Sequence, residues 1–138
     1  MWDKLFSGVD LIHKGMSVAW TRDHVIRNNI ANAETPGFKG STVEFETILA
    51  RSLERPNFAP KMTNERHIPV GHSEYTEPMS VDPVIRRHED LSMRMDENNV
   101  DVEAENVKLA QNAIQYNTLM AKLNSELTRI KFAINEGR

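Results

Sequence analysis

Two long stretches with heptad spacing, one at each end of the chain, constrain its fold more than any other feature of the sequence. In the first stretch, from about residue 4 to 33, the steps between apolar residues alternate between four and three, interrupted by the polar Asp23. These apolar residues are Leu5, Val9, Ile12, Met16, Ala19, Ile26, Ile30 and Ala33. The spacing is typical of a coiled-coil seam and predicts a helix roughly 45 Å long.

The second stretch, residues 100–138, shows the same alternation of steps. Its seam residues are Val102, Asn106, Leu109, Ala113, Tyr116, Met120, Leu123, Leu127, Ile130 and Ile134. Asp101 can cap the start of this helix, where Glu103 and Glu105 favour the positive end of the helix dipole. A second stripe on another face consists of Val107, Ile114 and Ala121. One partner helix cannot easily bury both stripes.

The two seams are of nearly equal length and are joined by a long insert. We therefore predict a mainly α fold, in which residues 1–35 and 100–138 pair as an antiparallel coiled coil and residues 36–99 form a central insert. If Ala33 meets Asn106, the polar Asp23 lies opposite Tyr116. We expect this pair to set the register to within about one helical turn, because a polar seam residue selects one alignment.

Several features indicate that the helix pair needs further partners. Gly8 and Gly15 weaken the first helix by up to about 1 kcal/mol each, which suggests close backbone approach or simply a weaker helix. Trp20 and Val25 lie off the seam and would be exposed on a solitary helix. We expect self-association or packing with related chains, and a heterologous contact of this kind builds rings or helical tubes.

The first helix is predicted to end at a Pro-Gly turn. Pro36 lacks a donor N–H and pushes Thr35 out of the helical region, and Gly37 allows positive φ, so Thr35 to Phe38 is predicted to be a type II turn. The preceding amides of Asn28, Asn29 and Asn32 can satisfy carbonyls at the helix end or bond to a neighbouring chain. An ordinary asparagine-rich helix end is the alternative interpretation.

The insert begins with Ser41 and Glu44, whose spacing is that of a capping box and predicts a short helix. The apolar side of this helix would contain Phe45, Ile48, Leu49 and Leu53. Prolines between residues 55 and 83 indicate a loop or a partly disordered segment. Residues 80–86 and 91–95 could form a small hairpin.

Composition and motifs exclude several function classes. A net charge of -3 over 138 residues gives no basic footprint for nucleic acid. No apolar run reaches the roughly 20 residues of a membrane span, and the N-terminus does not resemble a cleaved secretory signal. The potential ligands His67, His72, Glu74 and His88 lack metal-site spacing, so we expect no metal, no cofactor and no catalytic residues.

Residues 29–39, Asn-Ile-Ala-Asn-Ala-Glu-Thr-Pro-Gly-Phe-Lys, closely resemble the ANxxTPGY-type signature of the flagellar basal-body rod and hook family. The residues that match it, and that the resemblance implies for assembly, are Asn29, Ile30, Asn32, Thr35, Pro36, Gly37 and Phe38. Phe38 replaces the usual tyrosine, and Arg27 and Asn28 stand where the family has small residues. Residues 99–105 also resemble the family's stretch at the head of its C-terminal helix.

The resemblance implies a structural subunit of the proximal rod. Its paired helices would form the inner layer of a hollow tube that transmits torque and passes exported subunits. The chain would leave the cytoplasm through the flagellar type III export gate without a cleaved signal and assemble in the periplasmic rod. Its partners would be other copies, other rod proteins and the adaptor between rod and membrane ring.

Phe45 and Leu49 resemble the recognition motif of early export substrates, although any amphipathic turn supplies such a pair. The main alternative function is a cytoplasmic coiled-coil adaptor or chaperone-like binding module, which requires the same heptads without export. An enzyme is the third alternative, and no phosphate-binding loop or acid/base pair supports it.

Overall fold

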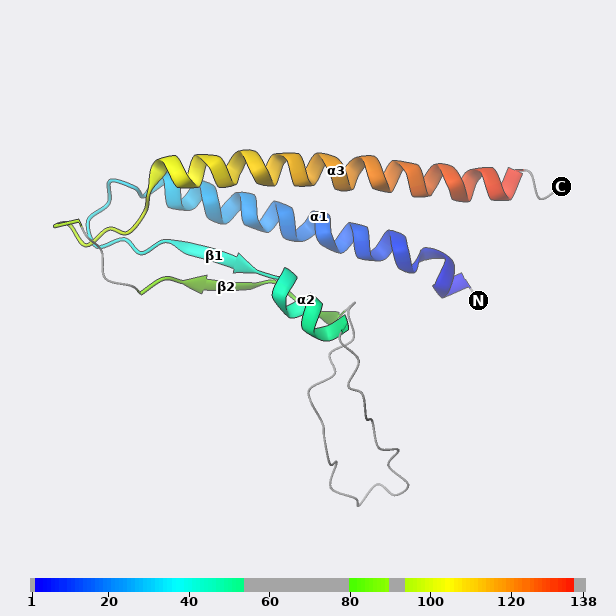
Figure 1. Cartoon of the computed structure of the whole chain (residues 1–138), viewed down its shortest axis with the longest axis horizontal. Coiled ribbons are helices and arrows are strands. Elements are labelled where there is room, and N and C mark those ends of the chain that lie inside the picture. The colour runs from blue at the N-terminus through cyan, green and yellow to red at the C-terminus, as the bar shows by residue number, and fades with distance from the viewer. Residues whose placement is uncertain (1, 54–79, 90–93, 136–138) are drawn as a thin grey trace, which may run out of the picture.

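The computed structural model of the chain describes residues 2–53, 80–89 and 94–135. In chain order, its elements are α1 (Trp2–Ala31), β1 (Ser41–Glu44), α2 (Glu46–Leu53), β2 (Val84–Arg87) and α3 (Val102–Asn135). Figure 1 shows the long helices α1 and α3 side by side and antiparallel, with the strands and α2 on the far side of α1 from α3. The predicted mainly α fold with a small central β element is confirmed.

The register of the helix pair is fixed by polar contacts. The side-chain amide of Asn112 donates to the backbone oxygen of Ala19 at 2.8 Å, and Glu105 lies against Asn29. The pairing is thus displaced by about one helical turn from the predicted alignment of Asn106 with Ala33. Asp23 accepts a hydrogen bond from Arg27 of the same helix at 2.6 Å, whereas the side chain of Asn112 bonds across from α3 to α1.

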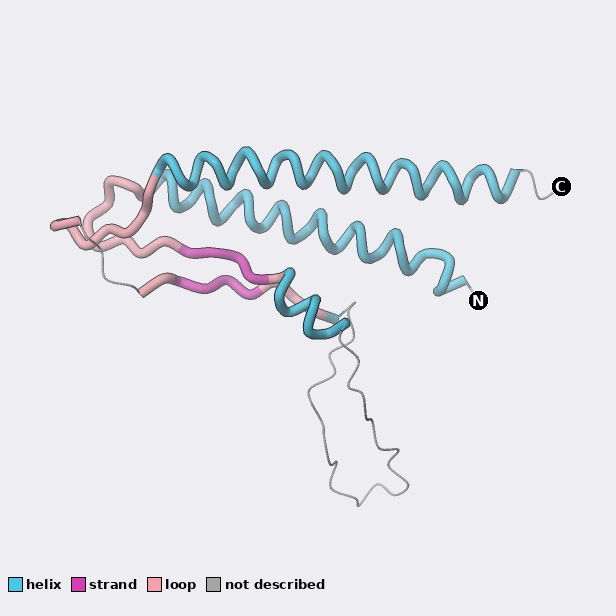
Figure 2. The backbone as a smooth tube through the Cα atoms, in the orientation of Figure 1, coloured by secondary structure: helices cyan, strands magenta, loops and turns pink. Residues whose placement is uncertain are grey.

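A small hydrophobic core lies between α1 and the insert. Val18 of α1 packs with Val43, Phe45 and Val81, and partly buried Val25, Ile48 and Leu49 surround this cluster. The two strands pair antiparallel, with Ser41 opposite Arg87 (Figure 2). The insert therefore covers one off-seam face of α1 within the chain, whereas Trp20 remains 65% exposed.

One prediction for the insert was wrong. Ser41 to Glu44 do not cap a helix: they form β1, and α2 begins at Glu46. Residues 84–87 pair with β1, and the predicted hairpin of residues 80–86 with 91–95 falls partly on residues 90–93, which lie outside the described ranges. The reason is that Val43 has an apolar face of α1 to cover, and a local capping pattern carries no information on this distant surface.

Candidate functional site

The end of α1 and the start of α3 are held together by a network of asparagines, which we call the asparagine joint (residues 29–41 with 94–105). At its centre, Asn98 is fully buried. Its side-chain amide donates to the backbone oxygens of Asn32, Ala33 and Thr35 at 2.9, 3.0 and 2.9 Å. Its Oδ1 accepts from the Val100 N–H at 2.8 Å. A residue far along the chain thus satisfies the orphan carbonyls at the end of α1.

Asn29 links three elements at the joint. Its Nδ2 donates to the Ser41 oxygen at 2.8 Å, and its Oδ1 accepts from the Ser41 N–H at 3.0 Å. The same Nδ2 donates to Glu105 Oε2 at 3.0 Å. Glu105 is buried and also pairs with Lys108 at 2.5 Å. Because these groups are buried and bonded, they fix α1, β1 and α3 in one arrangement.

Asn99 ties the entry of β1 to the exit of β2. Its Oδ1 accepts from the Gly40 N–H at 2.7 Å, and its Nδ2 donates to the His88 oxygen at 3.1 Å. A Cβ atom on Gly40 would lie 3.4 Å from Val100 Cγ2 and 3.5 Å from Asn99 Oδ1. These are side-chain atoms at ordinary van der Waals distances, so Gly40 packs directly against Asn99 and Val100.

The Pro-Gly turn has the predicted geometry. Gly37 has φ of 71°, and the Phe38 N–H donates to the Thr35 oxygen at 3.2 Å, as a type II turn requires. The Gly37 N–H also donates to the Asp96 oxygen at 2.7 Å. Burial would raise the pKa of the Asp96 carboxyl, but hydrogen bonds from the Asn98 N–H and the Arg94 guanidinium outweigh it and lower this pKa.

The structure gathers most of the signature residues at this joint. Asn29 and Asn32 bond within it, Ile30 is half-buried beside it, and Thr35 and Pro36 form its exposed turn. Sequence reasoning missed Asn98, Asn99 and Gly40. The adjacent pair Asn98-Asn99 before a capped helix was the available signal, but their partners are backbone groups that no side-chain pattern reveals.

The face of α3 that lies against α1 differs in part from the predicted seam. Leu109, Tyr116, Leu123 and Ile130 are half-buried at every seventh position. Between them the inward positions are Glu105, Asn112, Leu119 and Glu126. The predicted Met120 and Leu127 are instead 37% and 46% exposed on the flank of this line, so their placement in the intrachain seam was wrong. The error arose because the inward positions are partly polar.

On α1, the predicted seam residues lie on or beside the side that faces α3. Val9, Ile12 and Met16 are half-buried and Ile26 is buried, whereas the side chain of Leu5 lies outside the described part of the structure. A Cβ atom on Gly15 would lie 3.4 Å from Leu119 Cδ1, which is the close approach expected there. Gly8 meets nothing within 4 Å among the described residues.

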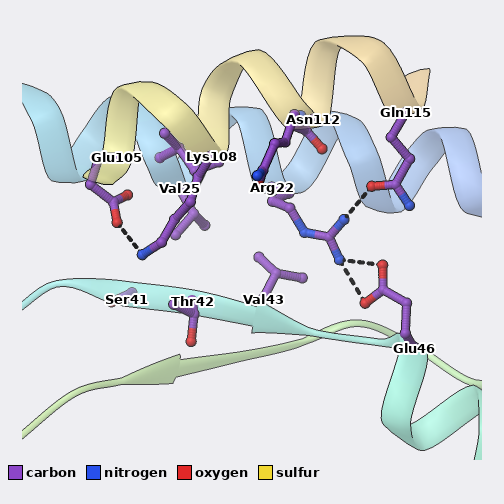
Figure 3. Close-up of a pocket in the computed structure, with 12 residues that line it drawn as sticks. Arg22, Val25, Ser41, Thr42, Val43, Glu46, Glu105, Lys108, Asn112 and Gln115 are labelled. Carbon is purple, nitrogen blue, oxygen red and sulfur yellow. Dashed lines mark hydrogen bonds and ion pairs between the residues drawn. The ribbon is translucent and has the colours of Figure 1, made fainter. Parts of the chain in front are cut away.

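Arg22 connects α1 with both α2 and α3 (Figure 3). Its guanidinium donates to Gln115 at 3.0 Å and to both carboxylate oxygens of Glu46 at 2.7 and 2.8 Å. Burial would raise the pKa of Glu46, but the hydrogen bonds and charge of Arg22 outweigh burial and lower it. The adjoining cavity has a volume of about 330 Å³. The ion pair with Glu46 joins α1 to α2, and the hydrogen bond to Gln115 joins α1 to α3.

The remaining predicted site residues either contact other parts of the fold or lie outside the described ranges. Phe45 is 4% exposed in the core cluster, and the Leu49 N–H donates to its backbone oxygen at 2.8 Å. His88 Nε2 lies 3.0 Å from Thr42 Oγ1, while His67, His72 and Glu74 fall outside the described ranges. Within those ranges, no cluster of three or more His, Cys, Asp or Glu side chains could hold a metal.

Large apolar side chains are left in solvent on both long helices. On α3, Val107 is 57% and Ile114 is 67% exposed, and Phe132 near the end of the helix is 61% exposed. Within the described segments, no helix is both long and apolar enough to cross a membrane. The exposed apolar side chains form a surface that association with other proteins would cover.

The chain is similar along nearly its whole length to flagellar basal body rod proteins. It is 32% identical to the flagellar basal body rod protein FlgB of Bacillus subtilis (strain 168), covering 97% of this chain and 98% of that protein. It is 28% identical to the FlgB of Proteus mirabilis (strain HI4320), covering 99% and 100%, and 26% identical to that of Escherichia coli (strain K12), covering 99% of each. No model of a protein family matches the chain.

Proposed function

The chain belongs to the FlgB family of flagellar basal body rod proteins, and from this premise we propose that it is a structural subunit of the proximal rod. The proposed role is mechanical: subunits form a hollow shaft that transmits torque and passes exported subunits through its lumen. The role requires no catalysis and no cofactor. The observation that carries the proposal is the exposed apolar surface of α1 and α3, which an isolated helix pair leaves uncovered.

We assign different roles to the helix pair and to the insert. Residues 1–35 and 100–138 would form the coiled-coil layer that lines the tube, and residues 36–99 would form the insert outside it. The asparagine joint supports this division because it fixes the angle at which the insert leaves the helix pair. A shaft needs such a joint, since torque applied to the helices would otherwise be lost in rotation of the insert.

Export would precede folding. Phe45 is buried between α1, β1 and α2, so a receptor could contact its ring only while the chain is unfolded. We therefore propose that the export gate reads Phe45 and Leu49 on the unfolded chain, which then folds in the periplasm. Other rod proteins, further copies of the chain and the adaptor to the membrane ring would be its partners there.

The test is to isolate detergent-resistant basal bodies from the source cells and search for the chain by mass spectrometry. We expect the intact 15.8 kDa chain in that fraction. Its presence solely in the soluble cytoplasm of flagellated cells would contradict the proposal and favour a cytoplasmic coiled-coil adaptor. A Phe45→Ala, Leu49→Ala double variant that reaches the rod as well as the parent chain would contradict the export step alone.

A further inference from the structure

A groove between α1 and the sheet opens away from α3, and we call it the Trp20 groove. Trp20, His24 and Asn28 of α1 form one wall, and Ile85 and Arg87 of β2 belong to the other. Trp20 and His24 contact edge to face, with ring centroids 5.2 Å apart. Trp20 is 65% and Ile85 is 56% exposed, so the groove presents apolar surface to solvent.

The charge in this groove is confined to one end. Lys39 and Arg87 line it, and no Asp or Glu is among the described residues that do so. Arg87 pairs with Ser41, which is bonded to Asn29, so the cations lie toward the asparagine joint. Trp20 lies two helical turns further from the joint. A ligand for this groove needs an acidic end and an apolar end, about 12 Å apart along α1.

The outward face of α3 has this pattern. Glu103, Val107, Ala110 and Ile114 are all exposed. Helical spacing places them opposite the line through Glu105, Asn112 and Leu119 that faces α1. We call these four residues the outer stripe. Its acid comes first and its largest apolar side chain comes last, and Glu103 and Ile114 are separated by about 16 Å along the helix. This span exceeds the roughly 12 Å along α1 by a length that the long Arg87 side chain can reach.

We propose that the outer stripe of one copy docks in the Trp20 groove of a second copy, an inference that rests on the proposed function. Glu103 pairs with Arg87, and Ile114 packs against Trp20 and Ile85. The small Ala110 lets the helix approach the groove closely. Opposite charges at one end and apolar groups at the other fix the direction in which the helix enters.

The direction determines the symmetry of the assembly. The docked α3 runs antiparallel to the receiving α1, as the receiving copy's own α3 does, so the two copies point the same way. The contact also joins two different surfaces. Such a heterologous contact generates rings or helical tubes, whereas a two-fold dimer needs the same surface on both copies. Docking of the outer stripe in the Trp20 groove would thus build an assembly in which all copies point the same way.

The natural chain has no cysteine, so disulfide trapping tests this contact cleanly. Ile85→Cys and Ile114→Cys are expressed as two separate full-length chains in the same cells, and their basal bodies are isolated and oxidised. We expect a disulfide-linked pair of chains when both variants are present, and at least a tenfold weaker band with either alone. The pair Met95→Cys with Ile114→Cys is the matched control, because Met95 is fully exposed and outside the groove.

A charge reversal provides the second readout. Glu103→Arg and Arg87→Glu should each lower incorporation into basal bodies several-fold, and the double variant should restore it. Strong dimers of Ile114→Cys alone would overturn the inference in favour of a two-fold contact. Normal incorporation without an Ile85–Ile114 cross-link would overturn it while leaving the proposed function intact. Absence of the parent chain from basal bodies would instead overturn the proposed function.

Discussion

The two ends of the helix pair are built on different principles. At the joint, α1 and α3 are held by buried asparagines whose side chains bond to backbone atoms, and Asn98 is fully buried. Toward the chain termini the helices diverge (Figure 1), and Phe132 and Ile134 are 61% and 64% exposed. The buried bonds of the joint are all made within a single chain, whereas the open end presents apolar surface that a neighbour can cover.

The difference determines how each end tolerates change. Hydrogen bonds to buried backbone groups are directional, so removing one partner leaves the other unsatisfied in a buried site. Exposed apolar side chains contribute little to a single chain but can contribute strongly to an assembly. Substitutions of buried residues at the joint should therefore alter folding, and those of exposed residues at the open end should alter association.

The largest effect is expected for Asn98→Ala. The variant removes two amide N–H donors from the carbonyls at the end of α1 and the acceptor of the Val100 N–H. At about 1 kcal/mol for each of these three lost bonds, the free energy of unfolding should fall by about 3 kcal/mol. Urea unfolding of the purified chain, followed by circular dichroism, measures this loss. Asn106→Ala on exposed α3 is the control and should change stability by less than about 0.5 kcal/mol.

If Asn98→Ala lost no more stability than the control Asn106→Ala, the side chain of Asn98 would not be what holds the end of α1. Asn98→Asp sharpens the result, because it keeps the side-chain acceptor for Val100 and replaces the amide donor with a carboxylate. A loss of stability equal to that of the alanine variant would assign the effect to the donor.

At the open end, Leu123→Asp and Ile134→Asp separate folding from association. Leu123 is half-buried against α1, so the buried charge should cost about 2 kcal/mol of stability, whereas exposed Ile134 should cost less than about 0.5 kcal/mol. Both variants should enter basal bodies poorly in a mass-spectrometric count. Normal incorporation of Ile134→Asp would show that this end has no partner in the rod.

The turn at the joint is expected to be less sensitive than Asn98. Gly37→Val forces a β-branched residue to adopt φ of 71°, at a cost of roughly 1 to 2 kcal/mol. Gly8→Ala at the open end should instead stabilise the chain by up to about 1 kcal/mol, because its Cβ meets no described residue within 4 Å. Thermal unfolding of both variants tests this contrast, and a neutral Gly37→Val would argue against the strained turn.

The sequence predicted the features that depend on residues close together in the chain. The heptad spacing located both long helices, Pro36 and Gly37 predicted the turn, and Asp101 caps α3 as expected, accepting from the Glu103 N–H at 2.9 Å. The joint could not be predicted, because Asn98 bonds to backbone oxygens more than sixty residues away. The phase of α3 was missed because Asn112, a polar residue, faces α1.

The smallest predicted effect concerns Arg22 and Glu46, midway between the two ends. The pKa of Glu46 is lowered in the folded chain, because hydrogen bonds from Arg22 outweigh the opposing effect of burial. A lowered folded pKa stabilises the chain above the unfolded value of about 4.3, and this contribution is lost as pH falls through the lower folded pKa. Because the Glu46 side chain is 57% exposed, solvent screening limits the contribution to about 0.5 kcal/mol.

Urea unfolding of the parent chain and of Glu46→Gln at pH 7 and at successive steps below pH 4.3 measures this contribution. The parent should be more stable than the variant at pH 7, and the difference should vanish at the acidic end. Glu34→Gln, on the exposed approach to the turn, is the matched control and should track the parent at pH 7. A constant difference at every pH would mean that Glu46 acts through packing and not through its charge. The bracing of the three helices by Arg22 would then rest on its bond to Gln115, which carries no charge and does not titrate.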